Sequence, residues 1–167
     1  VFGTGEPKAQ VSDVTPDDTV IGSLCNIPLS INGKDCLALL DTGSMVSTIS
    51  ESYWRELGLP LEKLQRILEI KGVSGHVLPY LGYVVAQVDW PSLGRIDAPL
   101  LVVPDTDLNH KVPLLIGTNV LDNVFLCYRN TLGQKFLQKT TIPSPLYLAL
   151  RAISVTQKHT VGANGLY

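Results

Sequence analysis

The chain has little charge and no long hydrophobic run, and each shortage excludes a class of protein. Charged residues make up 17% of the 167 residues, the formal net charge is −2, and no basic block is present. This balance argues against nucleic acid or an anionic membrane surface as the partner. No apolar run reaches the roughly 18 residues that cross a bilayer, and the first residues lack the basic and apolar regions of a signal peptide.

Cysteine is also scarce. Cys25, Cys36 and Cys127 are odd in number, and no two of them form a Cys-x-x-Cys pair. We therefore predict small buried apolar side chains in a reducing compartment rather than a disulfide framework. A zinc site built from these cysteines with His76 or His110 lacks ligand spacing, so we predict no metal and no cofactor.

Hydrophobic residues, in contrast, reach 45%, which is typical of a globular core. Residues 1–21 are polar and are predicted to form a flexible N-terminal arm. Apolar residues then alternate from Cys25 to Ile31, which predicts a strand with one buried face. Asn32-Gly33 predicts a two-residue turn, and the return strand over 34–40 leads directly into Asp41.

An acid at the end of an apolar strand is the most unusual feature of the sequence. An unpaired buried charge is costly, so Asp41 is expected to have a chemical role or a partner. Thr42 and Ser44 bring hydroxyl groups beside it, and Gly43 lets backbone N–H groups come close. The Asp-Thr-Gly tripeptide alone is also compatible with a solvated turn at the end of a strand.

The rest of the chain contains a second half that resembles the first. Ser50 is predicted to cap a helix over 51–57, which ends at Gly58. The further predictions are a hairpin with its tip at 72–75, strands over 81–90 and 96–103, a polar loop over 107–111, an apolar run over 112–117, a short helix over 118–122 and a last strand over 125–128. The second apolar run, like the first, ends in glycine, but it carries no acid.

Three motifs in order resemble the retropepsin family of aspartic proteases. They are Leu39-Leu40-Asp41-Thr42-Gly43-Ser44, the tip Gly72-Val73-Ser74-Gly75, and Leu114-Leu115-Ile116-Gly117-Thr118-Asn119-Val120-Leu121. The amino-acid sequences of these motifs are most similar to those of proteases from the polyproteins of gypsy-type LTR retrotransposons. The resemblance covers about residues 22–130, which we predict to be the protease domain. It implies an all-β fold, namely a closed retropepsin-like barrel with short helices.

The resemblance also implies a homodimer, because one chain offers a single catalytic acid. Two Asp41 carboxylates would share one proton, activate a water and cleave a peptide bond. By analogy, Thr42 is expected to bond across the dimer, Gly43 to offer its N–H to the carboxylate, and Ser44 to donate to the outer carboxylate oxygen. Thr118 stands where many viral relatives have an arginine, which removes an ion pair from the analogy.

The implied substrate is an extended peptide or polyprotein held under the hairpin tip. The expected substrate-binding residues are Ser44, Met45, Val73, Ser74, Gly75 and Ile116. An apolar subsite wall is expected near Met45. The alternative function is a catalytically silent retropepsin-like module for dimerisation or peptide binding.

Residues 131–167 are predicted to be a C-terminal extension. Ser144-Pro145 is typical of a helix start, which favours a helix over about 145–157. Ile153 and Val155 also alternate, so a strand is the other option. No initiator Met is present, so we expect a piece of a longer chain that acts in the cytoplasm or inside an intracellular retroelement particle.

Overall fold

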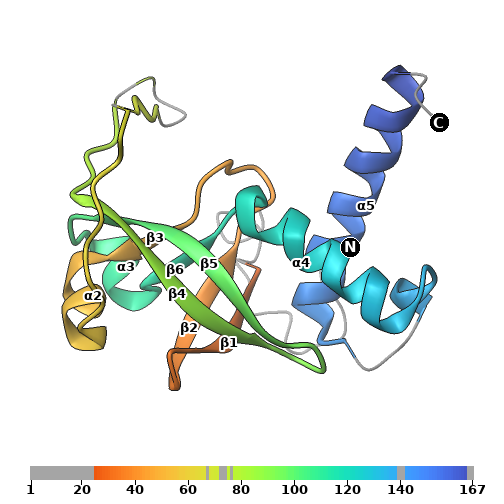
Figure 1. Cartoon of the computed structure of the whole chain (residues 1–167), viewed down its shortest axis with the longest axis horizontal. Coiled ribbons are helices and arrows are strands. Elements are labelled where there is room, and N and C mark those ends of the chain that lie inside the picture. Colours follow the sequence, from red (N-terminus) through yellow and green to blue (C-terminus); the bar gives the residue numbers. More distant parts are fainter. Residues whose placement is uncertain (1–24, 67, 72–74, 76, 139–141, 165–167) are drawn as a thin grey trace, which may run out of the picture.

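Six strands close into a barrel in the order β1-β2-β6-β3-β5-β4 (Figure 1). The computed structural model describes residues 25–66, 68–71, 75, 77–138 and 142–164, with the backbone only for 157–164. The strands are β1 (Asn26–Ile31), β2 (Lys34–Leu40), β3 (Thr48–Ser50), β4 (Gly82–Trp90), β5 (Gly94–Val103) and β6 (Leu114–Ile116). The predicted closed barrel is confirmed, whereas the predicted arm over 1–21 lies outside the described residues.

The β1–β2 hairpin follows the predicted pattern. Asn32 and Gly33 both have positive φ, at 49° and 85°, as a two-residue turn of this kind requires. The alternating residues Ile27, Leu29 and Ile31 are buried in the barrel core. Because β2 also pairs with β6 in parallel, Leu39 near its end is held between Asn26 of β1 and Leu115 of β6. The hairpin therefore delivers Asp41 from a rigid element.

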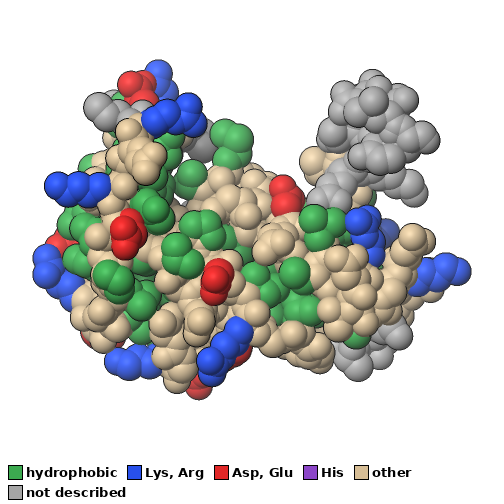
Figure 2. Space-filling model, viewed as in Figure 1, with side chains coloured by type: hydrophobic (Ala, Val, Ile, Leu, Met, Phe, Trp, Pro, Cys, Tyr) green, Lys and Arg blue, Asp and Glu red, His purple; other side chains and the backbone are tan. Residues whose placement is uncertain are grey.

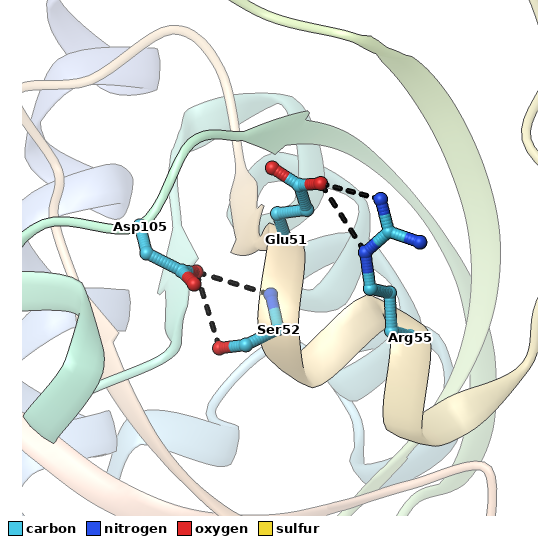
Figure 3. Close-up of polar contacts among 4 residues, drawn as sticks. All are labelled: Glu51, Ser52, Arg55 and Asp105. Carbon is cyan, nitrogen blue, oxygen red and sulfur yellow. Dashed lines mark hydrogen bonds and ion pairs between the residues drawn. The ribbon is translucent and has the colours of Figure 1, made fainter.

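Helix α2 (Glu51–Leu57) begins and ends where the sequence predicted. The Ser50 side chain accepts from the Tyr53 N–H, and Gly58 adopts a left-handed conformation with φ of 68°. Asp105, in the segment after β5, accepts from both the N–H and the hydroxyl of Ser52, at 3.0 and 3.1 Å (Figure 3). The first turn of α2 is thereby fixed to the neighbouring segment.

Two predictions about local structure were wrong. Residues 107–111 form a short helix, α3 (Asp107–Lys111), rather than a polar loop. Thr106 and Asn109 form a reciprocal capping box at its start, and this local bonding accounts for the helix.

The predicted last strand over 125–128 is the middle of a helix, α4 (Thr118–Leu132). Val120, Leu121, Val124, Phe125 and Tyr128 are its buried residues, and their spacing is helical. Residues 125–128 resemble a strand only when they are considered without the residues that precede them. A short 3-10 helix, η2 (Phe136–Gln138), follows.

The long helix α5 (Ser144–Asn164) packs against β1, β2, α4 and η2. The strand alternative for Ile153 and Val155 is therefore wrong. Leu146, Ala149, Leu150 and Ile153 of this helix belong to the same buried cluster as the barrel residues. Among the described helices, none is long and apolar enough to cross a membrane.

The three cysteines carry free thiols. Cys36 is buried on β2, and burial raises the pKa of its thiol to about 11. Burial also raises the pKa of the Cys25 thiol, which donates to the Pro145 carbonyl at 3.1 Å. Cys127 is half-buried on α4. The buried position of Cys36 agrees with the prediction of a small apolar residue.

Candidate active site

The half-buried Asp41 lies at the first position after β2 and is held by backbone hydrogen bonds. Its N–H donates to the Ile116 carbonyl at 2.8 Å, which ties the turn to β6. Its carboxylate Oδ1 accepts from the Gly43 N–H at 2.9 Å, as expected, and its carbonyl accepts from the Ser44 N–H at 3.2 Å. These bonds fix the direction of the carboxylate and leave it open to solvent. Thr42 and Gly43 are exposed at the tip of the turn.

The segment after this turn lies directly on the corner between β6 and α4. The Thr118 N–H donates to the Ser44 carbonyl at 2.7 Å. A Cβ atom added to Gly117 would lie 2.6 Å from the Ser44 carbonyl oxygen and closer still to that of Val46. Only glycine permits this approach, so the predicted second apolar run ends in glycine to accommodate the first turn.

A buried hydroxyl that the sequence did not single out holds the same two segments together. Ser47 is 1% exposed, and its Oγ donates to Asn119 Oδ1 at 2.7 Å and accepts from the Gly117 N–H at 2.8 Å. Asn119 Nδ2 donates in turn to the Pro99 carbonyl of β5 at 3.3 Å. The only signal in the sequence was a serine inside an otherwise β-like segment.

Two predicted site residues lie differently from expectation. The Ser44 hydroxyl donates to the Val46 carbonyl at 2.8 Å rather than to the outer oxygen of Asp41, because the turn folds back on itself there. The side chain of Ile116 lies fully inside the core, so it does not line the surface around Asp41. Its neighbour Leu115 does so instead.

A cavity of about 400 Å³ lies between the Asp41 turn and the hairpin that precedes β4. Its lining residues are Asp41, Gly43, Ser44, Met45, Val46, Glu69, Ile70, Lys71, Leu78 and Leu115. Figure 1 shows this hairpin rising from the barrel beside the turn, and Figure 2 shows apolar side chains gathered between the hairpin and the middle of the molecule. A cavity lined mainly by apolar side chains together with a few charged groups is typical of a ligand site.

The stem of the hairpin is ordered by a few specific bonds. Lys71 and Val77 form an antiparallel bridge, and the Leu78 N–H donates to the Ile70 carbonyl at 2.6 Å. The Tyr80 hydroxyl accepts from the Leu68 N–H at 2.9 Å. The exposed side chains of Lys71 and Glu69 form an ion pair at 3.3 Å, so this wall of the cavity carries both signs of charge.

The tip residues Val73 and Ser74 lie outside the described residues. Gly75 is described and has φ of 84°, a conformation that favours glycine. Met45 is 83% exposed and lines both the Asp41 cavity and a second, mainly apolar cavity of about 330 Å³. The structure therefore brings Asp41, Gly43, Ser44 and Met45 together around one cavity.

The described residues include no cluster of three or more His, Cys, Asp or Glu side chains able to hold a metal ion. The ionisable side chains that line the cavity are those of Asp41, Glu69 and Lys71, and Glu69 and Lys71 are paired with each other. The Gly43 N–H holds the Asp41 carboxylate in one orientation through its bond to Oδ1.

A family model described as aspartyl protease matches residues 27–120, which is more than half of the chain. The matched segment includes the Asp41 turn, the hairpin and the Gly117 corner. The chain therefore belongs to the aspartyl protease family.

Two solved structures are similar to the chain. EIAV protease complexed with the inhibitor HBY-793 is 20% identical, with a TM-score of 0.48 over 61% of this chain and 88% of that one. The retroviral protease-like domain of Ddi1 from Leishmania major is 18% identical, with a TM-score of 0.43 over 62% and 74% of the two chains. No curated protein matches the chain.

Proposed function

We propose that this protein is an aspartic endopeptidase that acts as a homodimer, with one Asp41 from each chain in a shared site. The observation that carries the proposal is the position of Asp41. Its carboxylate is fixed by the Gly43 N–H, and Asp41 lines the cavity next to the hairpin. Membership of the aspartyl protease family supports the same chemistry.

The proposed reaction needs two carboxylates, and the sequence contains a single Asp-Thr-Gly. Two Asp41 side chains that face one another cannot both ionise easily, so they share one proton. The ionised carboxylate takes a proton from water, and the resulting oxygen attacks the peptide carbonyl carbon. The protonated carboxyl donates to the carbonyl oxygen, and a proton then passes to the leaving nitrogen as the C–N bond breaks.

The remaining site residues have supporting roles in this proposal. Thr42, exposed at the tip of the turn, bonds across the dimer and fixes the two turns relative to each other. Ser44 and Met45 contact the bound peptide from the side of the Asp41 turn. The hairpin tip around Val73, Ser74 and Gly75 closes over the other side of the peptide. The peptide binds in an extended conformation, as an added strand.

The proposed substrate is a polyprotein of the retrotransposon type that contains this protein as one segment. This part of the proposal depends on the amino-acid sequences of the three motifs, which most resemble those in proteases of gypsy-type elements. Cleavage of a longer precursor by the wild-type protein, and not by Asp41→Asn, would support it.

The test compares wild type with Asp41→Asn on a mixed peptide library, with products identified by mass spectrometry. Asp41→Asn should leave no cleavage above background, because asparagine cannot serve as the general base. Asp122→Asn is the matched control, since Asp122 is exposed on α4 and should retain full activity. Persistent cleavage by Asp41→Asn would refute the aspartyl mechanism.

The alternative function, a silent module for dimerisation or peptide binding, gives a different result in the same experiment. Wild type would then bind peptides without cleaving any. The complete sequence Asp41-Thr42-Gly43-Ser44 and the Gly43 bond to the carboxylate favour the active enzyme.

A further inference from the structure

We propose that Glu69 and Lys71 select the substrate by its charge, and that peptides with a basic side chain next to the hairpin bind best. Both residues lie in the hairpin that precedes β4. The inference rests on the proposed function, because it concerns the peptide that occupies the Asp41 cavity.

The two charged residues line the same cavity as the proposed catalytic acid. Glu69 and Lys71 line it from the hairpin, and Asp41 lines it from the turn after β2. Among the described residues, the other side chains that line this cavity are uncharged. A substrate side chain that reaches the hairpin wall therefore meets one charged group of each sign.

The stem of the hairpin holds the two charges side by side. Lys71 forms an antiparallel bridge with Val77, so this part of the stem is extended. Side chains two positions apart in an extended segment project to the same face. In agreement, Lys71 Nζ lies 3.3 Å from Glu69 Oε1. Figure 2 shows acidic and basic side chains together near the upper end of the hairpin.

The pair can exchange one of its members for a charged group of the substrate. The side chains of Lys71 and Glu69 are 60% and 62% exposed, and exposed pairs of this kind contribute little free energy. A lysine or arginine of the peptide can therefore replace Lys71 as the partner of Glu69 at little cost. An aspartate or glutamate can likewise replace Glu69 as the partner of Lys71.

The balance of charge in the cavity favours the basic side chain. Asp41 and Glu69 supply two carboxylates, and Lys71 supplies one ammonium group. In the proposed dimer the two Asp41 side chains share one proton, so together they keep one negative charge. The charges of Glu69 and Lys71 cancel. A basic substrate group is therefore attracted and an acidic one repelled, and such complementarity contributes to specificity.

The test measures the preference of wild type for lysine over glutamate in the library peptide that it binds most tightly. Each position of this peptide is changed in turn to Lys, Gln or Glu. Fluorescence anisotropy gives the ratio of Kd values, and cleavage gives the ratio of kcat/KM. We expect lysine to be favoured about two- to fivefold at one position or more, as for exposed ion pairs. The preference should disappear at about 1 M salt, which screens charges beyond about 3 Å.

Glu69→Gln and Lys71→Gln should shift this ratio in opposite directions. Glu69→Gln leaves the Lys71 ammonium to the substrate, so the ratio should fall to about one or below. Lys71→Gln leaves the Glu69 carboxylate to the substrate, so the ratio should rise about twofold or more. If the pair only stabilised the hairpin, both variants would change the ratio alike, because each of them breaks the same contact.

The matched control is the ion pair between Arg95 of β5 and Asp89 of β4. Its N···O distance is also 3.3 Å and both side chains are exposed, but neither residue lines the Asp41 cavity. Arg95→Gln and Asp89→Asn should therefore leave the ratio of lysine to glutamate peptides unchanged.

Binding and cleavage are measured on the same peptides, which separates this inference from the proposed function. Opposite shifts in the ratio of Kd values support charge selection even if no peptide is cleaved, a result that would refute the endopeptidase. Parallel shifts, an unchanged ratio or a wild-type preference for glutamate overturn charge selection even if peptides are cleaved. A wild-type protein that neither binds nor cleaves any peptide overturns both.

Discussion

Asp41 and Ser47 lie at the two ends of one short segment, and each is bonded to the β6–α4 corner. Asp41 is tied to Ile116 through the backbone, and Ser47 is tied to Gly117 and Asn119 through its side chain. The turn that carries the acid is therefore held at both ends by residues about 70 positions further along the chain. This arrangement fixes the carboxylate while the tip residue Thr42 stays exposed.

Ser47→Ala should lower the free energy of unfolding by about 1–3 kcal/mol. The substitution removes one hydroxyl and leaves the buried Gly117 N–H and the Asn119 side chain without that partner, and unsatisfied buried groups are costly. Urea unfolding followed by far-UV circular dichroism measures the loss.

The control for this prediction is Ser30→Ala on β1, where the described residues provide no side-chain hydrogen bond. It should change the free energy of unfolding by less than about 0.5 kcal/mol. Equal effects of the two substitutions would contradict the role assigned to Ser47.

At the scale of single residues, the sequence predicted what depends on near neighbours. The acid at the end of β2 and the bond from Gly43 both follow from four consecutive residues. The Ser47 bonds and the crowding at Gly117 could not be predicted, because they depend on how the two halves of the chain meet. The Ser44 hydroxyl was assigned to the wrong acceptor, since a carbonyl two residues away competes with the carboxylate.

The helices and strands differ in how far local sequence determined them. The β1–β2 hairpin and α2 have strong start and stop residues, namely Asn32-Gly33, Ser50 and Gly58, and both were predicted correctly. Helix α4 was missed beyond its first turns because its apolar residues only show a helical spacing over the whole of Val120 to Tyr128. A window of four residues cannot distinguish the helical repeat of apolar residues from the alternating repeat of a strand.

Asp105→Ala should destabilise the protein by roughly 1 kcal/mol through α2. The Asp105 carboxylate accepts from two donors of Ser52 and places a negative charge at the N-terminus of the helix, as Figure 3 shows. Thermal unfolding of the variant, with a lower midpoint than wild type, measures this contribution.

Arg55→Ala is the companion variant for this experiment. Arg55 pairs with Glu51 at 2.7 Å on the exposed side of the same helix, and such pairs contribute at most about 0.5 kcal/mol. A larger loss for Arg55→Ala than for Asp105→Ala would show that the surface pair, and not the cap, stabilises α2.

At the scale of the whole molecule, the Asp41 turn and the hairpin lie on one side of the closed barrel, and the far end of α5 rises towards that side (Figure 1). The barrel itself was predictable from the strand pattern and the resemblance together. The packing of α5 against β1 and β2 was not, because amphipathicity specifies which face is buried but not the partner. In the proposed homodimer, each chain would supply one of the two catalytic carboxylates.

The measurement that tests this account most directly is a titration of Asp41→Asn protein into a fixed amount of wild type, with peptide cleavage as the readout. Mixed dimers would contain one carboxylate and one amide, so cleavage should fall towards zero as the variant comes into excess. Asp122→Asn protein added in the same amounts should instead raise cleavage, since it supplies more active partners. Cleavage that stays constant while Asp41→Asn protein accumulates would contradict a site shared between two chains.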